Sequence, residues 1–145
     1  MARITRFEDI RAWQTARELT KSIYDVSGRE AFGRDYGLRN QIRRASVSVM
    51  SNIAEGFESR TQALFIDYLG RAKASAGEVR AQLYVALDQG YLKQPEFNEA
   101  FELAERAARQ LHAFMSYLET KRNVRRVRDG SVEYDVAGAK EDVDG

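Results

Sequence analysis

The side chains that could perform catalysis are few in this chain, and their spacing fits none of the common catalytic sites. His112 is the single histidine, and the chain has no cysteine. Thiol nucleophiles and thiolate metal sites are therefore excluded. A di-iron site in a helical bundle needs Glu-x-x-His pairs, but Arg109 stands three residues before His112 and no second histidine exists. We expect His112 to be a surface histidine, with a catalytic or ligand role as the alternative.

Motifs for phosphate binding and hydrolysis are also absent. The sequence contains no G-x-x-x-x-G-K-[ST] loop, no G-x-G-x-x-G, no H-E-x-x-H and no serine in a nucleophile elbow. Carboxylates such as Asp67, Glu78 and Asp88 have the spacing of ordinary surface residues on a helix. We therefore expect a protein that is not an enzyme, without catalytic residues, a metal site or a cofactor.

Clusters of basic residues indicate anion binding instead. Arg39 and Arg43 lie one helical turn apart in the middle of the chain, and Arg44 lies about 100° further round the same helix. Guanidinium groups match the oxygens of phosphates. The alternative for these arginines is salt bridges to acidic residues of neighbouring helices. A second, denser basic cluster lies near the C-terminus and consists of Lys121, Arg122, Arg125, Arg126 and Arg128.

This C-terminal basic cluster opens a polar segment that the composition predicts to be flexible. Basic tails commonly bind nucleic acid. The alternative is a solvated run of charges, partly neutralised by the acidic residues that follow it. The formal net charge of the whole chain is only +1. The prediction of nucleic-acid binding therefore depends on the two local clusters and not on the overall charge. We interpret both clusters as contacts to nucleic acid, with RNA favoured over DNA.

Apolar residues recur at alternating spacings of four and three, which predicts four helices packed as a bundle. The most regular apolar seam runs from Phe65 to Gly90. Capping-box patterns at Thr5–Glu8 and Ser59–Gln62 predict the starts of the first and third helices. The predicted helices cover about residues 7–27, 37–57, 61–90 and 95–122.

The long helices and short connectors predict the fold class: an all-α, antiparallel, up-down-up-down four-helix bundle. The alternative is an extended helical hairpin that completes its core only on dimerising. The bundle should occupy residues 1–122, and residues 123–145 should form a charged, disordered tail. No apolar run approaches the roughly 20 residues of a membrane span, and the N-terminus lacks the apolar core of a secretory signal. We expect a cytoplasmic protein.

The second predicted helix carries more apolar surface than one seam requires. Val47, Met50, Ala54 and Phe57 form a second apolar stripe. Either the helix is covered on two sides within one bundle, or this stripe packs against another subunit. Because an exposed patch would be a liability, we favour a homo-oligomer with these four residues at its interface. Asn52 lies on the main seam, where a hydrogen-bonded asparagine can set helix register or oligomer state, unless it rotates to the seam's edge.

Four segments together resemble a known family. They read FEDIRAWQTA (Phe7–Ala16), QIRRASVSVMSNIAEG (Gln41–Gly56), LGRAKASAGE (Leu69–Glu78) and QGYL (Gln89–Leu92). In order and spacing they are similar to the four-helix-bundle proteins encoded by intervening sequences inside bacterial 23S rRNA genes. The resemblance covers about residues 6–120. Ala74–Gly77 departs from the commoner Gly-Ser pair before the glutamate.

The resemblance implies a four-helix bundle that assembles as a ring-like homopentamer. It also implies similarity to the accessory proteins of diversity-generating retroelements, which are basic pentamers that bind nucleic acid and a reverse transcriptase. The leading hypothesis is therefore a non-enzymatic oligomeric bundle that acts as an RNA adaptor. The alternative is a protein-binding scaffold, or an accessory subunit for a reverse transcriptase or another partner, that does not itself bind nucleic acid.

Overall fold

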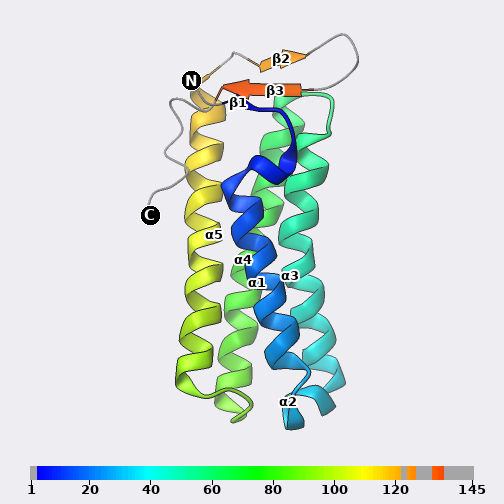
Figure 1. Cartoon of the computed structure of the whole chain (residues 1–145), viewed down its shortest axis with the longest axis vertical. Helices are drawn as coiled ribbons and strands as arrows, with labels where there is room; N and C mark the ends of the chain where they lie inside the picture. Colours follow the sequence, from blue (N-terminus) through cyan, green and yellow to red (C-terminus); the bar gives the residue numbers. More distant parts are fainter. Residues whose placement is uncertain (1–2, 122–123, 127–131, 136–145) are drawn as a thin grey trace.

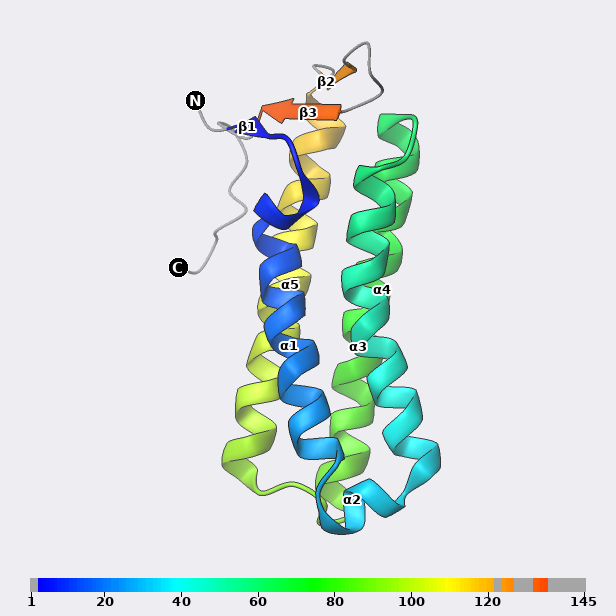
Figure 2. The ribbon, with the colours of Figure 1, turned by 45° about the vertical axis from the view of Figure 1, so that its right-hand side comes forward.

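Four long helices form an up-and-down bundle in the computed structural model, which describes residues 3–121, 124–126 and 132–135. Helix α1 (Arg11–Ser27) runs down the bundle, α3 (Tyr36–Phe57) returns, α4 (Gln62–Asp88) descends and α5 (Gln94–Thr120) ascends (Figure 1). The short helix α2 (Glu30–Arg34) joins α1 to α3 at the lower end (Figure 2). The all-α bundle predicted from the sequence is confirmed.

Each long helix packs against two others: α1 and α4 each contact both α3 and α5. The apolar seams face the interior, where Leu19, Phe65, Leu83 and Leu111 are fully buried. The core completes itself within one chain, so the fold does not need the second copy that a helical hairpin would require. None of the described helices combines the length and apolar character needed to cross a membrane.

The predicted start of the first helix is wrong. Thr5–Glu8 does not form a capping box. Instead a 3-10 helix, η1 (Phe7–Asp9), precedes α1, and Ile10 caps α1 with extended backbone and no side-chain hydrogen bond. Ile10 is fully buried, and the Phe7 ring meets Trp13 edge-on with 5.2 Å between ring centres. Burial of these apolar side chains outweighs the local capping preference of Thr5.

The start of α4 also differs from its prediction, by a small shift along the chain. Thr61 is the cap, and its Oγ1 accepts a hydrogen bond from the Leu64 amide at 3.1 Å. Ser59, the predicted cap, instead donates to the Gly56 carbonyl at the end of α3. The Ser59 hydroxyl therefore binds the C-terminal end of α3, and the Thr61 hydroxyl caps the N-terminus of α4. The bounds of α3, α4 and α5 otherwise lie close to the predicted ranges 37–57, 61–90 and 95–122.

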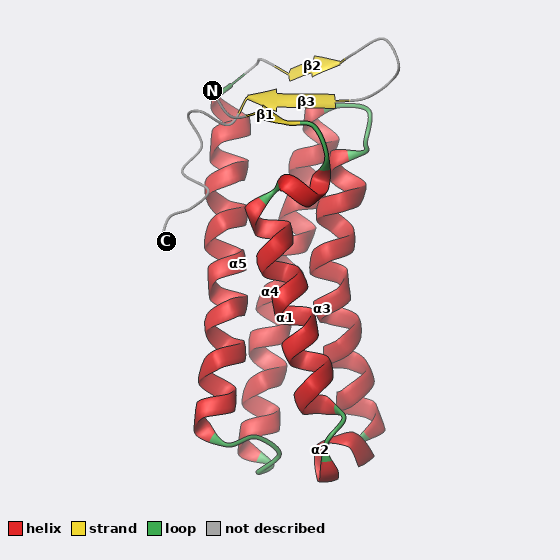
Figure 3. Ribbon diagram, in the orientation of Figure 1, coloured by secondary structure: helices red, strands yellow, loops and turns green. Residues whose placement is uncertain are grey.

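Short strands lie at the upper end of the bundle (Figure 3). Strand β3 (Val132–Asp135) pairs antiparallel with β1 (Arg3–Ile4) on one side and β2 (Val124–Arg126) on the other. The sequence predicted a disordered tail over residues 123–145, and these two segments amend that prediction. Strands of three or four residues are too short to be recognised from an alternation of apolar and polar residues. The other residues after Lys121 lie outside the described residues.

Candidate nucleic-acid interface

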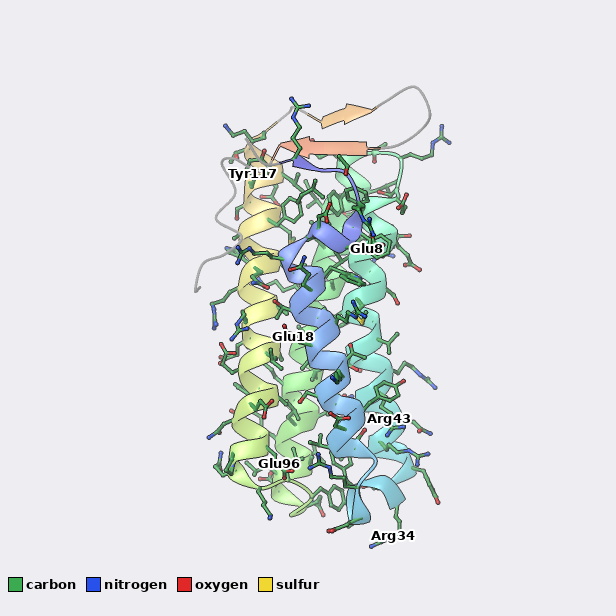
Figure 4. The ribbon with its side chains drawn as sticks, viewed as in Figure 1. Glu8, Glu18, Arg34, Arg43, Glu96 and Tyr117 are labelled. Carbon is green, nitrogen blue, oxygen red and sulfur yellow. The ribbon has the colours of Figure 1, made fainter. Side chains whose placement is uncertain are left out.

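The fold uses one arginine of the α3 cluster to hold α1. Arg43 Nε donates to Ser27 Oγ at 2.7 Å, and Nη2 donates to the Tyr24 carbonyl at 3.3 Å. Its guanidinium also lies over the Tyr24 ring, 4.4 Å from the ring centre. Tyr24 and the fully buried Ser27 belong to the last turns of α1, so Arg43 satisfies polar groups at a helix C-terminus. Figure 4 labels Arg43 in the lower half of α3.

Arg39, like Arg43, donates a hydrogen bond to a backbone carbonyl of the described residues, whereas Arg44 does not. Arg39 Nη1 donates to the Gly33 carbonyl of α2 at 3.0 Å, and its guanidinium lies 4.7 Å from the centre of the Tyr36 ring. Arg44 is exposed and has no hydrogen-bond or ion-pair partner among the described residues. The described residues therefore show none of the salt bridges that were the alternative for this cluster, and its contact with nucleic acid stays a prediction. Arg39 and Arg43 bind backbone carbonyls rather than carboxylates, and only Arg44 faces solvent.

The C-terminal basic cluster falls largely beyond the described residues. Lys121 is exposed at the end of α5, and its carbonyl accepts a hydrogen bond from Gln62 at 2.9 Å. Arg125 and Arg126 belong to β2, whose backbone alone is described, while Arg122 and Arg128 lie outside the described residues. Binding of nucleic acid by this cluster stays a prediction.

A basic groove that the sequence had not indicated lies between α4 and α5. Its volume is about 570 Å³. Helix α4 contributes Lys73 and Arg80, two turns apart, and α5 contributes Arg109 and His112, one turn apart. The described residues that line the groove are Lys73, Arg80, Glu105, Ala108, Arg109, His112 and Ala113. Positive charge therefore exceeds negative charge in the groove.

The polar contacts in the groove leave much of this charge unpaired. Arg80 is half-buried, forms no ion pair among the described residues, and has a buried Nε without a hydrogen-bond acceptor. Lys73 Nζ lies 3.5 Å from His112 Nδ1. Arg109 pairs with Glu102 at 3.4 Å. Because its lining carries three basic side chains other than histidine and one carboxylate among the described residues, the groove is suited to a ligand that brings acceptor oxygens and negative charge.

His112 is a residue of the groove whose side chain could take part in metal binding or proton transfer. Within the described part of the chain, no group of three or more His, Asp or Glu side chains could hold a metal ion. His112 is exposed, as the sequence predicted, and its hydrogen-bond contact is a lysine rather than a serine or carboxylate. The side chains present can bind and orient an anion.

The predicted oligomer interface is only partly exposed. The prediction of Phe57 as an interface residue is wrong, because its side chain is buried in the bundle. It is 3% exposed and packs edge-on against Phe65 with 6.0 Å between ring centres. Met50 is half-buried and packs against the same core cluster. Ala54 is half-buried, and Val47 is 38% exposed. Most of the second apolar stripe is thus covered within one bundle, which was the alternative interpretation.

Asn52 is satisfied mainly by its own helix. It is half-buried, and its Nδ2 donates to the Ser48 carbonyl at 2.8 Å and to Ser48 Oγ at 2.9 Å. Ser48 Oγ in turn lies 2.9 Å from Ser75 Oγ on α4. A chain of polar groups therefore links α3 to α4 through Ser48. Whether Asn52 sets helix register stays a prediction.

The fold and the groove define a small helical-bundle protein with a basic surface site. Comparison with known families places it more closely. The chain belongs to the 23S rRNA-intervening sequence protein family, whose model matches residues 8–113, and the resemblance drawn from its motifs is confirmed. The solved structure of a protein of unknown function from the S23 ribosomal protein family of Bacteroides thetaiotaomicron has a similar fold. The TM-score is 0.68 at 18% identity, over 72% of this chain and 95% of that one. No curated protein matches the sequence.

Proposed function

We propose that this protein is a non-enzymatic, oligomeric RNA adaptor of the cytoplasm that holds phosphate groups in the groove between α4 and α5. One observation carries the proposal: Lys73, Arg80, Arg109 and His112 surround a single groove, and Glu105 is the one carboxylate among the described residues that line it. Nucleic acid is favoured as the ligand because the family, the 23S rRNA-intervening sequence proteins, resembles retroelement accessory proteins that bind nucleic acid, and we take RNA as the form to test. The absence of cysteine fits a reducing compartment.

The chemistry of a phosphodiester complements that of the groove. Each phosphate brings one negative charge and acceptor oxygens without donors. The Arg80 guanidinium offers paired donors with the spacing of phosphate oxygens, and Lys73 adds a compact positive charge. Because the net charge of the chain is only +1, long-range attraction to RNA is weak and the affinity should come from this local cluster.

The salt dependence of RNA binding tests this assignment. Mobility shifts with single-stranded RNA should show an association constant that falls with salt, with a log–log slope of about −2 for three phosphate contacts. Arg80→Gln should weaken binding and reduce the magnitude of the slope by about 0.7. Arg34→Gln removes the same charge from the exposed end of α2, at the lower end of the bundle (Figure 4), and we expect it to leave both quantities unchanged.

Two results would count against the proposal. Absence of any RNA shift at low salt would refute RNA binding as such. Equal losses from Arg34→Gln and Arg80→Gln would show that binding follows net charge and that the groove is not the site. The C-terminal basic cluster is tested separately by neutralising Arg125 and Arg126 together, which should add to the effect of Arg80→Gln if both surfaces contact the same strand.

Self-association is part of the proposal. We infer a ring-like homo-oligomer, with a pentamer as the expected form. Val47, Leu64 and Val85 are 38%, 43% and 46% exposed, and burial of such apolar side chains against another copy supports assembly. Light scattering at micromolar concentration should give a mass well above the 16.5 kDa of one chain, and a monomer would contradict this part.

The same exposed apolar side chains favour the second candidate function, a scaffold or accessory subunit for a reverse transcriptase or another protein. Leu64 and Val85 both lie on α4, so one face of that helix could contact a partner. This candidate predicts co-purification of a protein without nucleic acid, and loss of that partner on Val85→Lys. The RNA adaptor predicts instead that Val85→Lys leaves the salt slope of RNA binding intact.

A further inference from the structure

An exposed aromatic ring continues the basic groove along α4. Tyr84 follows Arg80 by one helical turn and is 51% exposed. Its ring centre lies 5.2 Å from that of Phe97 and 5.4 Å from that of Phe101, both on α5. Phe97 is buried. Two rings of the neighbouring helix therefore hold Tyr84 from one side, and about half of its surface stays open to solvent.

We propose that Tyr84 stacks against a base of single-stranded RNA whose backbone lies in the groove; this inference rests on the proposed function. Proteins that bind single strands combine a basic groove for the backbone with aromatic side chains for the bases. A ring that is already positioned by Phe97 and Phe101 loses little conformational freedom when a base stacks on it. Bases in a duplex are stacked on one another and are not available. The groove should therefore select unpaired RNA.

The order of residues along α4 supports one continuous path. From Lys73 to Tyr84 the helix rises about 16 Å, with Arg80 between them. Adjacent turns place Arg80 and Tyr84 about 6 Å apart at their Cβ atoms, so one nucleotide can present its phosphate to the guanidinium and its base to the ring. Asp88 follows one turn later and is exposed, and its carboxylate ends the basic path.

Substitutions of Tyr84 test stacking separately from phosphate binding. The probes are a single-stranded RNA of about 12 nucleotides, longer than the path along α4, and the same strand annealed to its complement. Tyr84→Ala should weaken binding of the single strand about tenfold, which lies within the range for stacking of one base. The salt slope should not change, because no phosphate contact is lost. Tyr84→Phe keeps the aromatic face and should bind as the parent protein does.

A further variant guards against loss of structure. Tyr84→Leu keeps apolar contact with Phe97 and Phe101 but cannot stack, and it should show the same loss as Tyr84→Ala. The duplex should bind more weakly than the single strand and should be insensitive to Tyr84. Stacking is overturned if the leucine variant binds the single strand like the parent protein, or if both RNA forms lose affinity equally. If Arg80→Gln still lowers the salt slope in that case, phosphate binding survives and only stacking fails. Absence of RNA binding by the parent protein would refute both.

Discussion

Replacement of Gly56 by alanine should destabilise the bundle, although alanine is the better helix former. Gly56 is buried in the last turn of α3. A Cβ at this position would lie 2.6 Å from Tyr68 Cβ and 2.9 Å from Phe65 Cδ1, both on α4. Because Tyr68 Cβ is attached directly to the α4 backbone, a change of rotamer cannot relieve the contact. The two helices would have to move apart.

Two opposing effects set the size of this change. Alanine gains about 1 kcal/mol of helix propensity over glycine, while overpacking of a core costs about 1–3 kcal/mol. The rigid neighbour places Gly56→Ala toward the upper end of that cost, so we expect a net loss of about 1–2 kcal/mol in the free energy of unfolding. Gly70→Ala is the control: its Cβ would meet only the flexible end of Met115, at 3.5 Å, and the variant should gain about 1 kcal/mol.

Urea denaturation followed by helical circular dichroism measures both variants. The midpoint should fall for Gly56→Ala and rise for Gly70→Ala, with the slope of free energy against urea unchanged. If Gly56→Ala proves as stable as the parent protein, or gains stability as Gly70→Ala does, close contact at Gly56 does not set the distance between α3 and α4.

Three further predictions concern polar groups inside the bundle. Arg43→Ala should lower the free energy of unfolding by about 1–3 kcal/mol, because it leaves the buried Ser27 hydroxyl without its 2.7 Å partner; urea denaturation measures the loss, and RNA affinity should not change. Gln110→Met should stabilise the protein by about 1 kcal/mol, because Gln110 Oε1 is buried without a partner among the described residues; an unchanged or lower urea midpoint would contradict this. The hydrogen bond from Tyr91 to Asp35, followed by burial and the nearby charge, raises the pKa of Tyr91, so its stabilising contribution is complete below about pH 10 and is lost as pH rises through the folded-state pKa. Asp35→Ala should move part of the ultraviolet tyrosine titration to lower pH, and an unchanged titration would contradict this.

The bundle could be predicted from the sequence because its core depends on spacing alone. The seam that begins at Phe65 repeats often enough that no single residue decides it, and its apolar residues as far as Ala86 are fully buried. Helix starts depend on one or two residues, so a single tertiary contact can override them. Burial of Ile10 did so at the start of α1. Glycines are equally ambiguous in the sequence: Gly70 and Gly77 have room for a Cβ, whereas Gly33 and Gly56 do not.

The candidate site could not be predicted in the same way, because its charges come from two helices. Lys73 and His112 are 39 positions apart in the chain, yet their side-chain nitrogens lie 3.5 Å apart. The sequence-based prediction of nucleic-acid contacts named basic residues that are close together in the sequence. One of them, Arg43, instead donates hydrogen bonds to groups at the end of α1.

Local density of positive charge shows where cations are, but only packing decides which of them keep unused donors. A helix C-terminus presents several carbonyls without partners, and an arginine within reach binds them before any ligand does. Arg80 binds no such carbonyl in the described part of the chain, because it lies in the interior of α4. It also forms no ion pair with a carboxylate among the described residues. The apolar seam that packs α4 against α5 also determines where Arg80 lies, on the α4 side of the groove. Any RNA-binding surface here is a consequence of how the two helices pair, so substitutions that shift their packing should weaken binding without touching a basic residue.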